Sequence, residues 1–285
     1  MINGTFKIEK VWKLIAQILF YSTTILLILS AIGYQYSYKQ ILHDMQGGII
    51  WGIQTSFITS YLLVYILSSV INKTLKTITK KEFILLVTVL LFYFSILSTF
   101  SINTWNYFGW AFTCYCFGAF LKMYGNDYKI YKQKYPNVLF AVGCLLLIWV
   151  SMIMFDYSPI PKLKGKWSFL MSDANKLPVF LMAVFIFVFF KNLKVRHNKI
   201  INTVAASCFG VLLIHTNSDT MRQWLWKDFL HNTDRFTSSY LWLHMLLSCI
   251  GIYIACTIID ICRIKFLEKP IFNLIGNKKA KESGN

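Results

Sequence analysis

The chain has 285 residues, of which 56% are hydrophobic and 14% are charged. This composition excludes an ordinary soluble globular domain, in which about 25% of residues are charged. The formal net charge of +17 does not by itself indicate nucleic-acid binding, because the anionic headgroups of a membrane attract the same cationic residues.

Apolar segments of the length that crosses a bilayer as a helix recur along the chain. We predict about eight spans, at residues 11–32, 49–71, 83–101, 104–124, 137–155, 175–190, 200–216 and 240–262. The predicted fold class is therefore all-α, a polytopic bundle of transmembrane helices. Residues 1–275 are expected to form one integral-membrane domain, and the polar residues 276–285 a disordered cytoplasmic tail.

The distribution of Lys and Arg predicts the orientation of this bundle. An even number of spans places both termini on one side, and most of the 29 Lys and Arg residues fall on that same side. Cytoplasmic loops retain cationic residues, so both termini are expected to be cytoplasmic. Membrane orientation and lipid headgroups account for most of this charge, and a cytosolic anionic donor such as a coenzyme could use the rest.

Several kinds of site are disfavoured by the motifs that the chain lacks. All seven cysteines lie within predicted spans, and the C-x-C pair at Cys114 and Cys116 has no second ligand pair, so no metal site is expected. There is no phosphate-binding glycine loop, no H-E-x-x-H and no G-x-S-x-G.

Asp260, near the end of the last span, has Arg263 at i+3, which predicts a local ion pair.

The seventh span ends in a histidine, within the stretch FGVLLIHTNSDTMRQWLW. An ionisable side chain at the edge of the hydrocarbon region is costly unless it has partners, which favours a functional role. If the helix continues, His215, Asp219 and Arg222 lie on one face. Imidazole is the usual general base near neutral pH. The alternative is that these polar residues cap a helix end and contact water.

Three stretches resemble acyltransferase family 3, bacterial integral-membrane proteins that O-acylate surface polysaccharides. The first is the histidine-ending run, in which Leu212 replaces the usual tyrosine and the matches are Phe209, Gly210, Val211, Leu213, Ile214 and His215. The second has Ser69 where proline is common and matches at Trp51, Tyr61, Tyr65 and Asn72. The third matches at Tyr115, Gly118, Ala119 and Lys122. The resemblance covers nearly the whole chain in order.

The resemblance also implies that two helices are missing at the front. Members of the family typically have about ten spans, and the first carries an Arg and a His that are regarded as catalytic. Here INGTF looks like the end of the second span. A separately encoded two-helix segment is therefore one candidate partner.

By this resemblance, the protein is expected to be an O-acyltransferase of the bacterial cytoplasmic membrane. It would move an acyl group, expected to be acetyl, from cytosolic acyl-CoA to a hydroxyl of a surface polysaccharide or of its lipid-linked precursor, with no permanently bound cofactor. His215 would handle a proton and Asp219 would orient it. The acceptor would contact Arg222, Asn217 and Trp51, and the coenzyme phosphates would contact Lys73, Lys76, Lys80 and Lys81. A non-catalytic remnant or partner subunit, and a polysaccharide flippase or polymerase, remain alternatives.

Overall fold

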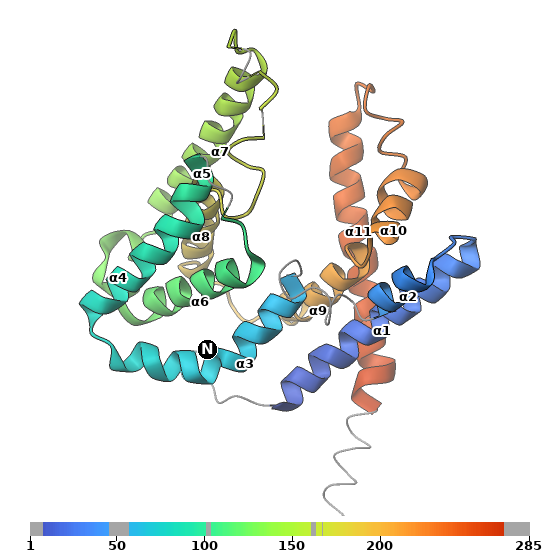
Figure 1. The fold of residues 1–285 in the computed structure, drawn as a ribbon, viewed down its shortest axis with the longest axis horizontal. Coiled ribbons are helices and arrows are strands. Elements are labelled where there is room, and N and C mark those ends of the chain that lie inside the picture. The colour runs from blue at the N-terminus through green and yellow to red at the C-terminus, as the bar shows by residue number, and fades with distance from the viewer. Residues whose placement is uncertain (1–7, 46–56, 101–103, 161–163, 167, 271–285) are drawn as a thin grey trace, which may run out of the picture. The chain divides into compact units, whose positions relative to one another are not determined.

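The computed structural model describes residues 8–45, 57–100, 104–160, 164–166 and 168–270. These residues contain helices and no strand, which confirms the all-α fold class. The chain divides into two compact units (Figure 1). Unit 1 consists of residues 1–8 and 52–195, and unit 2 consists of residues 9–51 and 196–285.

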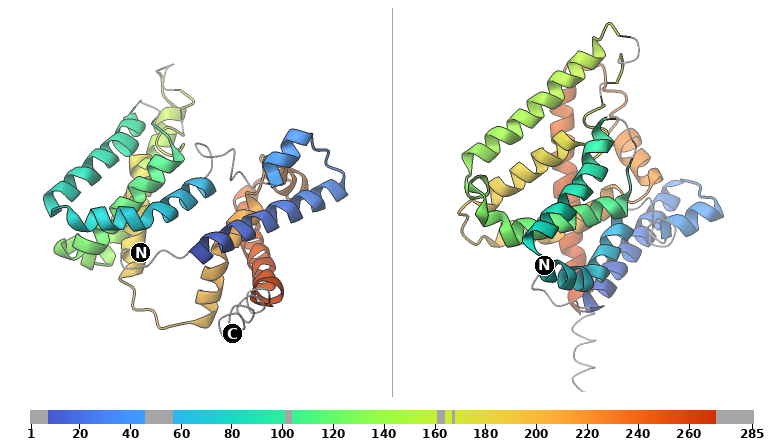
Figure 2. Two further views of the ribbon diagram at one scale, coloured as in Figure 1. Left: turned by 60° about the horizontal axis from the view of Figure 1, so that its bottom comes forward. Right: turned by 60° about the vertical axis from the view of Figure 1, so that its left-hand side comes forward.

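Unit 1 is a set of packed helices from the middle of the chain. In chain order its elements are α3 (Phe57–Thr77), α4 (Lys80–Leu91), η1 (Phe92–Leu97), α5 (Ser98–Phe100), α6 (Tyr107–Tyr124), η2 (Gly125–Asp127), η3 (Lys129–Lys132), α7 (Tyr135–Asp156) and α8 (Leu177–Lys191). Helix α6 packs against α3 and α4, and α7 lies alongside α8 (Figures 1 and 2). A buried cluster of α3, α4 and α6 forms its core around Leu75, Phe83 and Cys116.

Local sequence signals fix where these helices begin. The Thr79 hydroxyl accepts a hydrogen bond from the Glu82 amide (3.3 Å), and the Glu82 carboxylate accepts one from the Thr79 amide (2.7 Å), which together form a capping box at α4. Asn106 caps α6 by accepting from the Gly109 amide. Pro136 and Pro178 stand in the first turns of α7 and α8, where a missing amide hydrogen costs nothing.

Unit 2 combines the first helices of the chain with the last. Its elements are α1 (Ile8–Ile32), α2 (Tyr38–Met45), α9 (Lys199–His215), α10 (Asp219–Gln223), η4 (Trp224–Phe229), α11 (Leu241–Arg263) and η5 (Ile264–Glu268). Helix α11 packs against α9. Helix α1 ends at Gly33, whose φ of 106° lies in the left-handed region that glycine adopts without strain.

The structure confirms the predicted spans in part. Each of the eight predicted segments overlaps a helix, but only five helices among the described residues are long and apolar enough to cross a membrane. These are Ile8–Ile32, Phe57–Thr77, Lys80–Phe100, Tyr135–Asp156 and Leu241–Glu268. A sixth is obtained if α9 and the helix Asp219–Phe229, bent by 95° at their junction, count as one span. The protein is therefore a multi-pass membrane protein.

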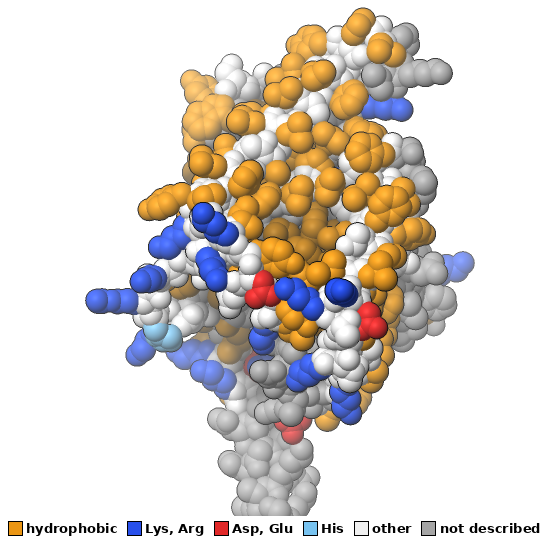
Figure 3. Space-filling model, turned by 90° about the vertical axis from the view of Figure 1, so that its left-hand side faces the viewer, with side chains coloured by type: hydrophobic (Ala, Val, Ile, Leu, Met, Phe, Trp, Pro, Cys, Tyr) orange, Lys and Arg blue, Asp and Glu red, His pale blue; other side chains and the backbone are white. Residues whose placement is uncertain are grey.

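Two of the predicted spans differ from expectation for simple reasons. Helix α8 is apolar up to its last residue, Lys191, but has only 15 residues, fewer than the roughly 20 that a bilayer requires. Helix α6 has 18 residues, but tyrosine, tryptophan, glycine and Lys122 lower its mean hydropathy. On unit 1, large apolar side chains face outward, as lipid contact demands, above a band of Lys and Arg side chains (Figure 3).

Candidate active site and a buried polar cluster

Helix α9 ends at His215, the residue that the sequence singled out. The helix begins at Asn198, whose side chain accepts hydrogen bonds from the amides of Ile200 and Ile201. At its other end, the Thr216 hydroxyl donates to the Leu212 carbonyl (2.7 Å), which satisfies one of the free carbonyls of the last turn. The polar residues after His215 therefore do act as helix caps, as the alternative interpretation proposed.

The ring of His215 is held in one orientation by its own helix. Its Nδ1 atom lies 2.6 Å from the carbonyl oxygen of Val211, one turn earlier. Because a carbonyl oxygen only accepts, Nδ1 must carry the proton in this contact. In the neutral ring, Nε2 is then the unprotonated nitrogen. The half-buried His215 side chain thus presents a proton acceptor at the end of α9.

Asp219 and Arg222 lie on a different helix from His215. Ser218 caps α10 by accepting from the Met221 amide (3.1 Å), and the chain turns by 95° between α9 and the helix that follows. The exposed Asp219 carboxylate pairs with the Arg222 guanidinium. The structure therefore brings Asp219 and Arg222 together, whereas the orienting partner of His215 is the Val211 carbonyl.

Asn217 connects the bend after α9 to α1. Its side-chain amide donates to the Leu213 carbonyl (3.2 Å) and to the Ser22 hydroxyl of α1 (3.4 Å). Elsewhere in unit 2, the Tyr34 hydroxyl donates to the Asp228 carboxylate, and this hydrogen bond raises the pKa of the Tyr34 phenol. Trp51, the third predicted acceptor residue, lies outside the described residues, as does the predicted tail at 276–285.

The four lysines predicted to meet a coenzyme lie in unit 1, at the junction of α3 and α4. Lys73, Lys76 and Lys81 are exposed. The Lys80 ammonium lies 2.6 Å from the Asp127 carboxylate and above the rings of Tyr124 and Tyr128. The charge of Lys80 is therefore compensated within the protein, whereas the other three lysines have no ion-pair partner among the described residues.

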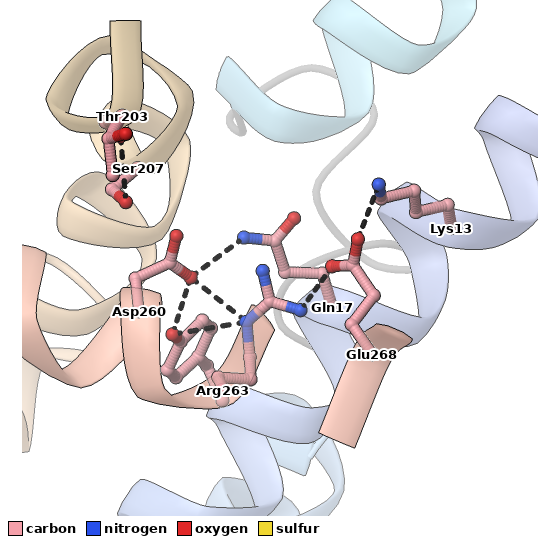
Figure 4. Close-up of polar contacts among 8 residues, drawn as sticks. Lys13, Gln17, Thr203, Ser207, Asp260, Arg263 and Glu268 are labelled. Carbon is pink, nitrogen blue, oxygen red and sulfur yellow. Dashed lines mark hydrogen bonds and ion pairs between the residues drawn. The ribbon is translucent and has the colours of Figure 1, made fainter. Parts of the chain in front are cut away.

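A buried polar cluster, absent from the sequence interpretation except for one pair, joins α1 to α11 (Figure 4). Asp260 is fully buried, and its Oδ1 atom accepts from Tyr21 (2.6 Å), from Gln17 (3.4 Å) and from Arg263 (2.9 Å). This confirms the predicted Asp260–Arg263 pair and adds two partners from α1. The Oδ2 atom of Asp260 is buried without a hydrogen-bond partner among the described residues.

The cluster continues into the last helical turn of the described chain. Arg263 Nη1 lies 2.7 Å from the Glu268 carboxylate in η5, and Glu268 also pairs with Lys13 of α1. Two carboxylates and two cations thus alternate, so that the charges within the cluster balance. Such pairing is what allows charged groups to be buried at all.

An apolar cavity of about 390 Å³ lies beside this cluster. Tyr21 and Arg263 contribute to its wall, and Ile214, the neighbour of His215, contributes from α9. The cavity therefore adjoins both the buried cluster and the end of the helix that carries the histidine.

Two polar residues of unit 1 that carry the family resemblance, Asn72 and Tyr115, contact each other. The Tyr115 hydroxyl of α6 donates to the Asn72 side chain of α3 (2.9 Å). Asn72 is buried, so this hydrogen bond satisfies a polar group between two packed helices. Sequence spacing could not reveal the contact, because the two residues lie in different helices.

Together, the helical spans and a histidine fixed at a helix end define a multi-pass membrane protein with a candidate proton-accepting site. The family model described as "Acyltransferase domain", that of acyltransferase family 3, matches residues 4–261. The chain belongs to acyltransferase family 3, and this membership indicates transferase activity. No curated protein and no solved structure matches the chain.

Proposed function

We propose that the protein is a bacterial membrane-bound O-acyltransferase that modifies a cell-surface polysaccharide or its lipid-linked precursor. The acyl group, expected to be acetyl, would come from cytosolic acyl-CoA. The observation that carries this proposal is the family match over residues 4–261, which includes the helix that ends in His215.

His215 is the proposed general base on the acceptor side. Its Nε2 atom would take the proton of an acceptor hydroxyl while the hydroxyl oxygen bonds to the acyl carbon. The bond from that carbon to the donor sulfur breaks, and the sulfur leaves as the thiolate of the coenzyme, which is then protonated. The Val211 carbonyl supports this role, because it holds the proton on Nδ1 and leaves Nε2 free.

Asp219 and Arg222 have a joint proposed role. The Asp219 carboxylate holds the Arg222 guanidinium, and Arg222 together with Asn217 would contact polar or anionic groups of the acceptor sugar. Asp219 is then a positioning residue. The exposed lysines Lys73, Lys76 and Lys81 remain candidates to attract an anionic donor to the membrane surface.

The test is the base-labile acetyl content of the surface glycan, measured by NMR in a deletion strain that carries the wild-type or the His215→Ala gene. We expect His215→Ala to lower acetylation by about 10²-fold or more, as loss of a general base does, at unchanged membrane abundance. His197→Ala, which removes an exposed histidine before α9, is the matched control.

Three outcomes of this experiment separate the alternatives. Unchanged acetylation in His215→Ala would refute the assignment of the base. A deletion strain whose glycan keeps its acyl esters but changes in length or export would indicate a flippase or polymerase. Acetylation that returns only when a two-helix segment is co-expressed would indicate a partner subunit.

A further inference from the structure

A second pocket, of about 360 Å³, opens within unit 1 between α6, η3 and α8. Its volume lies in the range of about 300–1,000 Å³ that is typical of small-molecule sites. Most of its wall is small or apolar, and the charged side chains in it are Lys122 and Lys191. Four of the residues that carry the family resemblance line this pocket: Tyr115, Gly118, Ala119 and Lys122.

The two lysines lie at the same end of the pocket wall. Lys122 is in the last turn of α6 and Lys191 is the last residue of α8, whereas Cys114 and Phe187 line the pocket from earlier turns of these helices. The Lys191 ammonium lies 3.5 Å from the centre of the Tyr131 ring. Burial raises the pKa of the Tyr131 phenol, so the ring stays neutral and holds the cation by its π face.

Neither lysine has a carboxylate partner in the part of the chain that the structure describes. Of the carboxylates in the same region, Asp127 is paired with Lys80, and Glu82 caps α4. The loop beside the pocket adds further cationic residues, Lys129, Lys132 and Lys134. Among the described residues, the positive charge that Lys122 and Lys191 give the pocket wall therefore has no carboxylate partner.

Hydrogen bonds from two side-chain amides hold the backbone of η3, which forms part of the pocket wall. The buried Asn137 amide donates to the carbonyls of Ile130 (2.8 Å) and Gln133 (2.7 Å). The side-chain amide of Asn192, the C-cap residue of α8, donates to the Tyr131 carbonyl (2.9 Å) and to the Gln133 carbonyl (3.2 Å). Two side-chain amides thus fix the backbone of η3 against α7 and α8, which pre-organises the site.

Gly118 gives the pocket part of its space. A Cβ atom built at this position meets no other atom within 4 Å, so the absence of a side chain here leaves room rather than allowing close packing. A side chain at position 118 would therefore begin in open space next to the pocket that Gly118 lines.

We propose that this pocket binds the diphosphate group of the acyl-coenzyme A donor, with Lys122 and Lys191 contacting its phosphate oxygens. The inference rests on the proposed acyl transfer, and on the expectation that the lysine-rich side of the protein faces the cytosol. The pantetheine chain would continue along the apolar wall at Cys114 and Phe187. Ammonium groups bind phosphate oxygens by charge-assisted hydrogen bonds.

The proposal is tested by calorimetric titration of coenzyme A into the full chain in nanodiscs of zwitterionic phosphatidylcholine. We expect Lys122→Gln and Lys191→Gln each to weaken binding about tenfold, as loss of a charged hydrogen bond does. Gly118→Leu should abolish binding by filling the pocket. The matched controls, Lys227→Gln in η4 and Gly143→Leu in α7, should bind as the wild type does, because Gly143 also faces open space.

Size-exclusion profiles and melting temperatures establish that each variant is folded. Wild-type protein that does not bind coenzyme A, or lysine and Gly118 variants that bind it as well as the controls do, would overturn the proposal. In that case, glycan acetylation that still depends on the gene would show that the transferase function stands and the donor binds elsewhere. Lysine-dependent binding in a protein without acetylation activity would instead uphold the pocket and refute the proposed function.

The phosphate of a lipid headgroup could bind the same two lysines, and a second set of titrations tests this. The titrations are repeated in nanodiscs that contain phosphatidylglycerol, and co-purified lipid is detected by native mass spectrometry. Coenzyme A binding that survives in both membranes supports the nucleotide donor. Phosphatidylglycerol retained through Lys122 and Lys191, without coenzyme A binding in either membrane, would assign the pocket to a lipid headgroup and overturn the proposal.

Discussion

Gly210 of α9 lies directly against the carboxyl group of Asp260 of α11. A Cβ atom at position 210 would overlap the carboxyl carbon of Asp260. The missing side chain therefore lets the helix that ends in His215 approach the buried cluster of Figure 4. This gives a physical reason for glycine in the FGVLLIH run that resemblance alone did not supply.

Gly210→Ala is expected to destabilise the protein. The new methyl group must displace a fully buried carboxylate that three side chains hold, and such overpacking costs about 1–3 kcal/mol in the free energy of unfolding. The measurement is thermal unfolding in detergent. Gly251→Ala in α11 is the control, because a Cβ there meets nothing within 4 Å and alanine favours the helix by up to about 1 kcal/mol. Equal melting temperatures for the two variants would contradict the contact.

Arg263→Met should be strongly destabilising, because it leaves the fully buried Asp260 without its cation. Breaking one side of a buried ion pair costs about 3–5 kcal/mol. The double variant Asp260→Leu/Arg263→Met should lose less stability than the sum of the single variants, since it removes both members of the Asp260–Arg263 pair and leaves Glu268 paired with Lys13. Arg222→Met, which breaks an exposed pair with Asp219, should change the unfolding free energy by only about 0–1 kcal/mol. If the losses of unfolding free energy in the two single variants add up to the loss in the double variant, Asp260 and Arg263 are not directly coupled.

Asn175→Ala tests how the start of α8 is held in unit 1. The fully buried Asn175 amide donates to the Phe94 carbonyl (2.6 Å) and to the Ser98 hydroxyl (3.0 Å), across the π-helical segment η1. Its removal leaves a buried carbonyl unsatisfied, at a cost of about 1–3 kcal/mol in unfolding free energy. The exposed Asn126→Ala provides the comparison. If Asn175→Ala melts at as high a temperature as Asn126→Ala, the Asn175 hydrogen bonds do not hold the start of α8 in place.

Asp219→Asn should lower glycan acetylation by about tenfold, less than His215→Ala does, because Asp219 contacts Arg222 and not the histidine ring. Arg222→Gln should have a similar effect, and the double variant should be no worse than either single one. The readout is the rate at which acetyl appears on the glycan. The opposite result would be a loss of acetylation in Asp219→Asn as large as in His215→Ala, with Arg222→Gln near the wild-type rate. It would indicate that Asp219 orients His215 and does not act through Arg222.

Much of the fold could be predicted from hydrophobic segments alone. The predicted spans 11–32 and 240–262 lie within or close to α1 (Ile8–Ile32) and α11 (Leu241–Arg263). The bend after His215 was not predicted. It arises because Ser218 caps a new helix, α10, and a hydropathy pattern does not show where one helix ends and the next begins. The π-helical turn at Phe92–Leu97 was also missed, since its freed carbonyl is satisfied by Asn175, far away in the sequence.

The site was predictable only where its contacts are local. The Asp260–Arg263 pair follows from i,i+3 spacing and is present. The bond from Tyr21 to Asp260 joins residues 239 positions apart, and no periodicity in either helix indicates which faces meet. A carboxylate inside an apolar run was the one available signal that a distant donor was needed.

The discontinuous make-up of unit 2 has a consequence for biogenesis. Residues 52–195 of unit 1 are contiguous, so their helices can meet as soon as they leave the ribosome. Helix α1 is made first, yet its Gln17 and Tyr21 meet Asp260 only after more than two hundred further residues have been synthesised. Until then, Gln17 and Tyr21 lack the carboxylate that accepts their hydrogen bonds in the folded unit, so α1 reaches its final contacts only when α11 has been made.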